Sequence, residues 1–289
     1  MNIRDLRQGF IGLLAALVVA VGAGAAMPLA AATRSLAPDV RSQAALIVRT
    51  DTGEVLYSKN ADRTLPIASI TKLMTAMVVI DAGQSLDERL QITSAEVDRL
   101  RGSSSRLAVG TRLTRRQALL LALMSSENRA AAALLRTYPG GRTAGVAAMN
   151  RKARALGMTR SGFVEGTGLS GENRSTPADL VRLVQAASRY PLIRDFSTRE
   201  QFSIMVGRHP TLYRNTNPLV RNPGWDIDLT KTGYLSEAGR CLVMKTRITN
   251  TPVVMILMNS WGNLTRVGDA NRVRRWLEAG HLGQATARR

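Results

Sequence analysis

The stretch IASITKLMTA, residues 67–76, places Ser69 and Lys72 inside an otherwise apolar run. Residues at i and i+3 lie on one face of a helix, so the lysine amine can reach the serine hydroxyl. Burial or a neighbouring cation lowers the pKa of a lysine, and its free amine can then accept a proton, which arginine cannot do. The pair therefore indicates a serine nucleophile with a lysine base, set at a helix start whose N–H groups face an incoming carbonyl oxygen.

Alone, the S-x-x-K spacing is a weak signal, because it arises about once by chance in a chain of this length. A lysine that merely solvates a helix is nevertheless out of place in so apolar a run. Other hydrolase motifs, G-x-S-x-G and H-E-x-x-H, do not occur. The two histidines, His209 and His281, lie in no supporting context, so a serine nucleophile here needs a base other than histidine.

Two further stretches carry polar groups suited to a cleft. MSSENRAAAA puts Ser126 and Asn128 at a break between two expected helices, where they could also simply cap a helix. LTKTGYLS puts Lys231, Thr232 and Gly233 on an expected strand, where the glycine leaves room for a substrate beside the backbone. The alternative for the second stretch is an edge strand protected by its lysine.

S-x-x-K, S-x-N and K-T-G in this order, with a helical insert between them, resemble the penicillin-binding proteins and serine β-lactamases. Within them the chain resembles the low-molecular-mass D-alanyl-D-alanine carboxypeptidase and endopeptidase family, from about Gln43 to Ser260. GSSSRLAVGTRLT, EGTGLSGENRSTPADL and KTGYLSEAGRCLVM are similar to segments of that family. Glu127 between the serine and asparagine resembles the endopeptidase branch. So does the short chain, in which we expect no extra β domain or amphipathic anchor.

The resemblance implies catalytic roles for Ser69, Lys72 and Ser126, substrate-binding roles for Asn128, Lys231, Thr232, Gly233 and Tyr234, and no metal ion or cofactor. Ser69 would attack the carbonyl carbon of a D-alanyl peptide bond while Lys72 takes its proton. Ser126 would relay a proton to the leaving amine. A β-lactam would acylate Ser69 as a substrate mimic that leaves slowly.

The binding roles follow the same resemblance. Asn128 would hold the substrate amide, and Lys231 and Thr232 would bind the anionic end of the substrate. Backbone N–H groups of Ser69 and Tyr234 would form the oxyanion hole.

The expected function is therefore a D,D-peptidase acting on peptidoglycan stem peptides, as an endopeptidase on cross-links or as a carboxypeptidase. A serine β-lactamase is an alternative, for which Glu165 or Glu172 would have to activate the deacylating water. EGTGLSGENR does not resemble the loop that carries that glutamate. A wall-binding or penicillin-sensing protein without activity is a further alternative, against which the complete set of motif residues argues.

The N-terminus has the order of a secretory signal. Arg4 and Arg7 precede the apolar run FIGLLAALVVAVGAGAAM, and small residues follow, with cleavage expected near Ala32. An uncleaved membrane anchor is the alternative, since the run is near the minimum length for a span. We expect a signal peptide over residues 1–32 and a single catalytic domain over 33–289, in the periplasm or secreted, without a stable membrane anchor.

The chain is strongly basic, with a formal net charge of +19. Such a charge favours polyanionic surroundings such as anionic lipid or an acidic wall polymer. Export and an aromatic content of only 4% argue against nucleic acid as a partner. The single cysteine, Cys241, lies in the apolar run CLVM and is expected in the core.

The elements that must position these residues follow from the patterns of apolar residues. QAALIVRT and EVLYSKN predict a hairpin, and the run from about residue 69 to 81 predicts a buried helix ending at Gly83. A lobe of helices is expected over about 85–200, with Thr114 and Thr176 as N-caps. Three strands follow Gly224, and a last helix follows them. The expected fold is α/β in composition (α+β), β-lactamase/transpeptidase-like, with an all-helical lobe inserted in an antiparallel sheet.

Overall fold

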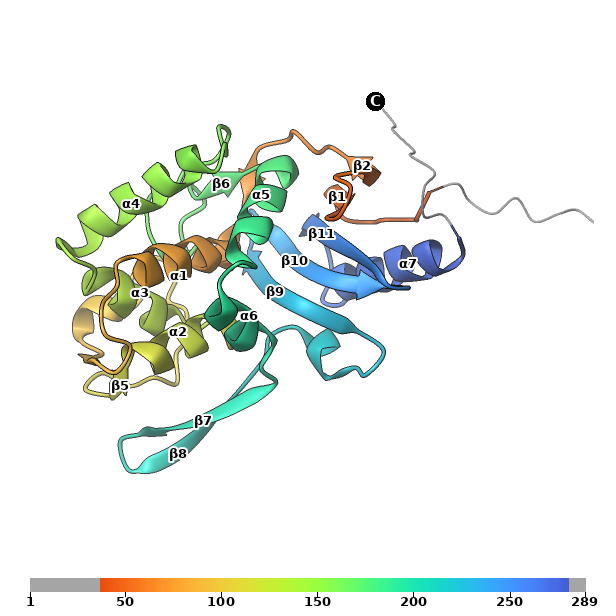
Figure 1. The fold of residues 1–289 in the computed structure, drawn as a ribbon. Coiled ribbons are helices and arrows are strands. Elements are labelled where there is room, and N and C mark those ends of the chain that lie inside the picture. The colour runs from red at the N-terminus through yellow and green to blue at the C-terminus, as the bar shows by residue number, and fades with distance from the viewer. Residues whose placement is uncertain (1–36, 281–289) are drawn as a thin grey trace, which may run out of the picture. The chain divides into compact units, whose positions relative to one another are not determined.

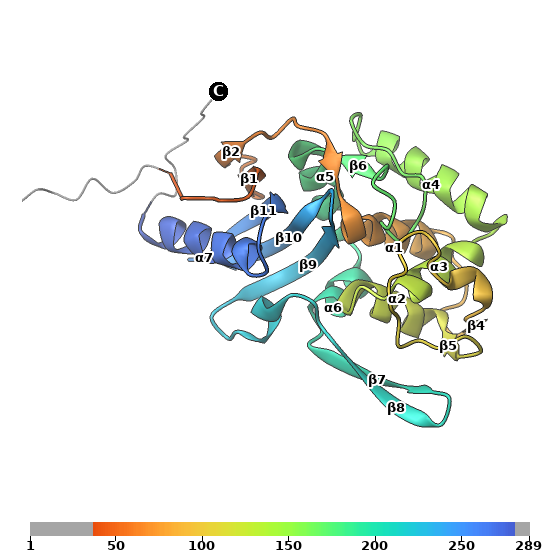
Figure 2. The same ribbon diagram turned by 180° about the vertical axis from the view of Figure 1, so that it is seen from behind.

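The computed structural model describes residues 37–280, and the expected signal peptide over residues 1–32 lies outside them. One antiparallel sheet of five strands runs in the order β2-β1-β11-β10-β9 (Figures 1 and 2). Its strands are β1 (Ala44–Arg49), β2 (Val55–Lys59), β9 (Asp226–Leu235), β10 (Gly239–Ile248) and β11 (Thr251–Ser260). The prediction that N- and C-terminal strands close one sheet is confirmed.

The middle of the sheet is buried on both faces, which explains why strands β1 and β11 are mostly apolar. Along β1, Leu46 and Val48 face one hydrophobic cluster while Ala45 and Ile47 face the other, as the two-residue period of a strand requires. Helix α5 (Pro177–Ala187) contacts β1, β10 and β11, and its buried side chains belong to the first cluster. Helix α7 (Thr265–Glu278) contacts β10 and β11 and contributes to the second.

Helix α1 (Thr71–Asp81) forms the centre of the helical lobe. It follows the 3₁₀ turn η1 (Ala68–Ile70), and nine of its eleven residues are buried. The helices that contact it are α2 (Arg115–Met124), α3 (Asn128–Arg136), α4 (Gly141–Ala155), α5 and α6 (Pro191–Thr198). The prediction of a helix apolar on every side is confirmed, because neighbours surround α1.

Two predicted N-caps are present. Thr114 Oγ1 accepts the N–H of Gln117 (3.1 Å) at the start of α2. Thr176 Oγ1 accepts the N–H of Asp179 (3.1 Å) at the start of α5, where Pro177 occupies the first turn. Each satisfies a backbone donor that the first helical turn leaves unpaired. Cys241 is fully buried, and burial raises the pKa of its thiol to about 11, in agreement with a core residue.

The lobe is not purely helical, and the expectation that strands return only after Gly224 is wrong. Two short strands that precede α2 in the sequence, β4 (Arg89–Gln91) and β5 (Arg112–Thr114), pair with each other. Another pair is formed by β3 (Leu65–Pro66) and β6 (Arg174–Ser175). A hairpin of β7 (Gln201–Val206) and β8 (His209–Arg214) follows α6. Its apolar residues alternate along β7, and Gly207 adopts the positive φ of its turn.

Two further 3₁₀ turns, η2 (Ser94–Glu96) and η3 (Pro218–Arg221), complete the elements. No helix within residues 37–280 has the length and apolar character needed to cross a membrane.

Candidate active site

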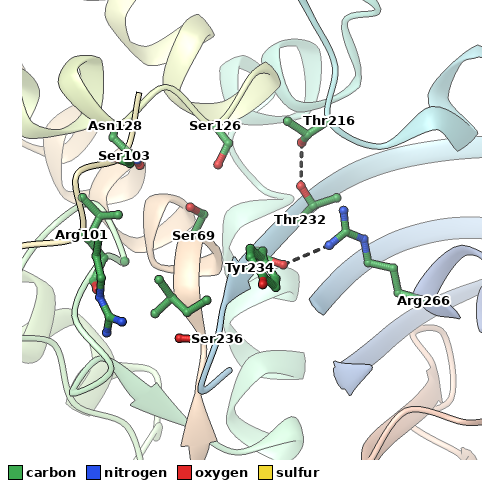
Figure 3. A pocket seen from close by; sticks show the side chains of 14 residues that line it. Ser69, Arg101, Ser103, Ser126, Asn128, Thr216, Thr232, Tyr234, Ser236 and Arg266 are labelled. Carbon is green, nitrogen blue, oxygen red and sulfur yellow. Dashed lines mark hydrogen bonds between the residues drawn. The ribbon is translucent and has the colours of Figure 1, made fainter. Parts of the chain in front are cut away.

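A cleft of about 460 Å³ lies where the helical lobe meets strand β9 (Figure 3). Its lining comes from η1, from the segment that precedes β5, from the start of α3 and the junction before it, from the loop after α4, from the segment after β8, and from β9 and α7. The lining residues are Ser69, Arg101, Ser103, Ser126, Asn128, Gly168, Leu169, Thr216, Thr232, Gly233, Tyr234, Leu235, Ser236 and Arg266. All three predicted motifs therefore meet at one cleft, although their residues lie far apart in the sequence.

Ser69 sits in η1, directly before α1, with its side chain in the cleft. Ala68 before it has a φ of +46°, a left-handed conformation that is uncommon for a residue with a Cβ. Such strain persists where the surrounding structure enforces it, and it is concentrated at functional sites. The sharp turn at Ala68 delivers the Ser69 hydroxyl to the cleft.

Lys72 lies beneath Ser69 and is fully buried. Its Nζ donates to Ser69 Oγ (2.8 Å), to Asn128 Oδ1 (2.8 Å) and to the backbone oxygen of Thr167. Burial lowers the pKa of Lys72 to about 8, although the negative charges of Glu165 and Glu127 oppose the shift. The amine can therefore exist in both protonation states near neutral pH.

Lys231 forms a second buried pair, with Ser126. Its Nζ donates to Ser126 Oγ (2.9 Å) and to the backbone oxygen of Thr232 (2.9 Å), and the residue is 1% exposed. Burial holds the pKa of Lys231 well below its ordinary value, and the positive charges of Lys72 and Arg266 lower it further. Ser126 itself has a φ of +59° at the junction of α2 and α3. Each buried lysine thus contacts a serine that lines the cleft.

Two glycines allow the backbone segments around Ser69 to approach closely. A Cβ on Gly233 would lie 3.0 Å from the backbone oxygen of Ile67 and 3.1 Å from the backbone nitrogen of Ser69. A Cβ on Gly168, whose φ is +80°, would lie 2.0 Å from the backbone oxygen of Ala68. A Cβ on Gly233 would thus meet the turn at residues 67–69, and Gly233 also lines the cleft. The expected room for a substrate beside this strand stays a prediction.

The loop that follows Phe163 is organised by Glu165. Its carboxylate accepts the N–H of Gly168 (2.6 Å) and the side-chain amide of Asn173 (2.8 Å). Asn173 also donates to Thr71 Oγ1 of α1 (3.1 Å). Glu165 is therefore engaged in holding this loop against η1 and α1, while Glu172 is exposed on its outer side.

Several cleft residues escaped the sequence analysis. Thr216, after β8, accepts a hydrogen bond from Thr232 Oγ1 (2.6 Å), and Ser103 accepts one from the amide of Asn128 (3.1 Å). Arg266, on α7, donates to the backbone oxygen of Gly233 (3.0 Å). Thr216 and Arg266 lie in stretches without a signal of their own, and the segment GSSSRLAVGTRLT, although similar to the family, gave Ser103 no individual role. Only the fold brings the three residues to the cleft.

The remaining predicted residue, Tyr234, lines the cleft and is 57% exposed, with the guanidinium of Arg240 stacked 4.5 Å from its ring centre. Arg101 and Arg266 lie on opposite sides of the cleft (Figure 3). Within the described part of the chain, no group of three or more His, Cys, Asp or Glu side chains is placed to hold a metal ion. Of the four serines that line the cleft, Ser69 and Ser126 each contact a buried lysine.

Comparison with known proteins gives consistent results. Residues 31–262 match the family of D-alanyl-D-alanine carboxypeptidases. A D-alanyl-D-alanine endopeptidase of Pseudomonas aeruginosa is 48% identical over 282 residues, covering 96% of this chain and 90% of that protein. A D-alanyl-D-alanine endopeptidase of Escherichia coli is 46% identical, with coverage of 96% and 90%.

Solved structures of similar fold belong to related enzymes. The crystal structure of the Streptomyces K15 DD-transpeptidase superposes with a TM-score of 0.75 at 27% identity and covers 84% of this chain and 98% of its own. The resemblance to penicillin-binding proteins found in the sequence is thereby confirmed in both sequence and fold. With the serine–lysine cleft described above, these matches show that the chain belongs to the D-alanyl-D-alanine carboxypeptidase family of serine peptidases.

Proposed function

We propose that the protein is an exported D,D-endopeptidase that cleaves D-alanyl peptide bonds in peptidoglycan cross-links through an acyl-enzyme at Ser69. The observation that carries the proposal is the 2.8 Å contact between Ser69 Oγ and the Nζ of Lys72, whose pKa is lowered to about 8. The names of the relatives from Pseudomonas aeruginosa and Escherichia coli favour the endopeptidase reaction. Carboxypeptidase activity on uncross-linked stem peptides is the alternative.

In the first step Lys72 takes the proton of Ser69. The ammonium form has three hydrogens and three acceptors, Ser69 Oγ, Asn128 Oδ1 and the backbone oxygen of Thr167. Of these only the serine hydroxyl can also donate. In the neutral amine the lone pair therefore faces Ser69, and the two remaining hydrogens serve Asn128 and Thr167. Lys72 is thus oriented as a general base for attack by Ser69.

In the second pair Ser126 serves the leaving group, and Lys231 is left for recognition of the substrate. Ser126 Oγ lines the cleft and accepts from Lys231, so its own hydrogen is free to be donated to the departing amine. Asn128, fixed through Lys72 and Ser103, would hold the substrate amide. The backbone N–H groups of Ser69 and Tyr234 would stabilise the oxyanion.

The anionic end of the substrate would bind at the hydroxyl of Thr232 and near the charge of Lys231, supported by Thr216 and by the positive charge of Arg266. Arg266 donates to a neutral backbone oxygen, so its charge is available to a carboxylate. Gly233 keeps this strand close to the turn that carries Ser69.

Water would then hydrolyse the acyl-enzyme. A β-lactam would acylate Ser69 in the same way and leave slowly, because Glu165 is engaged by the loop around it and is not a free base for deacylation. This favours a peptidase over a β-lactamase. We further propose that residues 1–32 are a cleaved signal peptide, that residues 33–289 form a single catalytic domain in the periplasm, and that neither nucleic acid nor a cofactor takes part.

Digestion of defined muropeptides tests the proposed activity. The purified mature protein should split cross-linked dimers at the D-alanyl bond faster than it removes the terminal residue of a pentapeptide. The Ser69→Ala variant should do neither. Faster trimming of pentapeptides would establish the carboxypeptidase alternative, and a wild-type protein that leaves both substrates intact would contradict the proposal.

A further inference from the structure

Glu127 is a buried carboxylate between two residues of the site, and the mechanism proposed above gives it no part. It follows Ser126 and precedes Asn128 at the junction of α2 and α3, and it is 8% exposed. Its carboxylate accepts the N–H of Arg129 (3.1 Å) and so caps α3. Serine, threonine, aspartate and asparagine are the usual N-caps, and a carboxylate is costly to bury. Capping alone therefore does not explain a glutamate at this position.

The same carboxylate ties α3 to the segment that begins at Ser103, a cleft residue, and ends at Leu107. We name it the wall segment. Glu127 Oε1 accepts from Ser105 Oγ (2.7 Å), which in turn accepts the N–H of Leu107 (3.0 Å). A second tie runs beside the first, since Arg129 Nη1 donates to the backbone oxygen of Leu107 (2.8 Å). The start of α3 thus holds the wall segment at two points.

The wall segment in turn fixes the side chain of Asn128. The amide nitrogen of Asn128 donates to Ser103 Oγ (3.1 Å), and the two residues lie side by side at the cleft (Figure 3). The amide oxygen accepts from Lys72 Nζ (2.8 Å). An amide has its donors at one end and its acceptor at the other, so the contact with Ser103 determines which end meets Lys72. A displaced wall segment would leave Asn128 free to turn.

The outer side of the wall segment is held by the β7–β8 hairpin. Arg106 Nη1 donates to the backbone oxygen of Leu212 (2.7 Å), and its guanidinium stacks 4.4 Å from the ring centre of Tyr213. Burial and the negative charge of Glu127 raise the pKa of Tyr213 to about 12, although Arg106 opposes the shift. The phenol of Tyr213 therefore stays neutral, and Arg106 is directed at the hairpin.

Glu127 also reaches Lys72 through its charge. Burial lowers the pKa of Lys72, and the negative charges of Glu165 and Glu127 oppose this shift. From β9 the charge that faces Lys72 is that of Lys231. Removing the charge of Glu127 would therefore lower the pKa of Lys72 further. A residue that only capped a helix would not produce this effect.

We propose that Glu127 is a positioning residue of the active site: its carboxylate holds the wall segment to α3 and so keeps Asn128 turned towards both Lys72 and the substrate amide. The inference rests on the proposed function, in which Asn128 holds the substrate and Lys72 activates Ser69. Glu127 is not among the residues that line the cleft, so it acts through Asn128 without touching the substrate.

The test measures acylation by benzylpenicillin from pH 5.5 to pH 9.5. At pH 9.5 the amine of Lys72 is mostly neutral, so the rate there reports positioning. Glu127→Ala removes both the hydrogen bonds and the charge, and should lose roughly ten- to a hundredfold at pH 9.5. Ser105→Ala removes the tie but leaves the charge and the helix cap, and should lose roughly three- to tenfold.

Glu127→Gln separates the charge from the hydrogen bonds. The amide keeps an oxygen that can accept from Ser105 and from the N–H of Arg129, so the rate at pH 9.5 should stay within about threefold of the wild type. The midpoint of its pH profile should move down by roughly 0.3 to 1 pH unit, because the neutral amine of Lys72 then forms at lower pH. Ser105→Ala should keep the midpoint of the wild type.

Two further variants complete the design. Glu127→Ala/Ser105→Ala should be no slower than Glu127→Ala alone, because both changes break the same tie. Thr114→Ala is the matched control, since it removes the N-cap of another helix in the same lobe. It should acylate as the wild type does at every pH.

Three results would overturn the inference. A Glu127→Ala variant as fast as Thr114→Ala would reduce Glu127 to a helix cap. Losses that add in the double variant would mean that Glu127 and Ser105 act independently, and an unshifted midpoint in Glu127→Gln would separate Glu127 from Lys72. Each of these, with normal acylation of the wild type, would overturn the inference alone. A wild-type protein that takes no benzylpenicillin would overturn the proposed function, and the inference with it.

Discussion

Two buried lysines each donate to a serine on the cleft surface, at 2.8 Å for Lys72 and 2.9 Å for Lys231, but the charges around them differ. Near Lys72 lie the carboxylates of Glu165 and Glu127, which partly offset the effect of burial and leave its pKa at about 8. Around Lys231 the influential charges are positive, so they add to the effect of burial. One lysine lies in a balanced field and the other in a field that favours anions.

This difference separates two tasks that use the same kind of contact. A lysine with a pKa near 8 exchanges its proton readily at neutral pH, as a general base must. A buried lysine among cations becomes more stable in its charged form when a carboxylate binds beside it. Lys72 is therefore suited to activating Ser69, and Lys231 to recognising the anionic end of the substrate.

Replacing the base should have the largest effect. In Lys72→Arg the positive charge remains but cannot be given up, so acylation by benzylpenicillin should slow by at least about a thousandfold. Stopped-flow or intact-mass kinetics would measure it. Lys152→Arg, at a partly exposed lysine paired with Asp81, is the control and should acylate normally. An arginine variant with near-normal acylation would remove Lys72 from the role of base.

The pH dependence sharpens the comparison. Because the neutral amine is the active form, the acylation rate should rise with pH and level off above about 8. Between pH 8 and pH 6 the neutral fraction falls by about fiftyfold, and the rate should fall with it. Acylation followed across pH 5.5–9.5 would report this. A profile that is flat, or that falls as pH rises towards 8, is incompatible with Lys72 as the base.

Removing the second lysine should affect recognition more than chemistry. Lys231→Met keeps a side chain of similar length without the charge, and should lower kcat/KM by about thirtyfold for substrates with a free terminal carboxylate. For the same peptides with an amidated end the loss should be much smaller. Steady-state kinetics on both forms would decide. Equal losses would assign Lys231 to the chemical step.

The smallest effect is expected from replacing Arg101, which lies on the side of the cleft opposite Arg266. Arg101 pairs with Glu237 and donates to the backbone oxygen of Leu169 (3.2 Å), and about a third of each charged side chain is exposed. Exposed pairs contribute at most about 1 kcal/mol, so Arg101→Gln should change kcat/KM by no more than about fivefold. Arg199→Gln, at another surface pair, is the control. A loss far beyond fivefold would show that Arg101 contacts the substrate directly.

The sequence analysis found the cleft residues that carry a local signal. Lys72 stands out because a charged residue interrupts an apolar helix, and Lys231 because it precedes threonine and glycine on a strand. The sheet follows from apolar strands at both ends of the chain. These features are readable because each one depends on neighbours a few residues away.

The cleft residues that could not be predicted from the sequence are brought there by contacts between distant segments. Arg266 reaches the cleft only because α7 packs on β10 and β11, and Thr216 only because the chain after β8 returns to β9. The β7–β8 hairpin is a different case. Phe202, Ile204 and Val206 alternate before Gly207, so its pattern was present, although Pro210 weakens it.

The central claim, that Ser69 is the nucleophile, is tested most directly by the intact mass of the mature protein after incubation with benzylpenicillin. The account predicts a persistent one-to-one adduct that is absent from the Ser69→Ala variant. Consumption of penicillin without a lasting adduct would instead indicate a β-lactamase. A wild-type protein that neither gains mass nor consumes penicillin would contradict the assignment of Ser69 as the nucleophile.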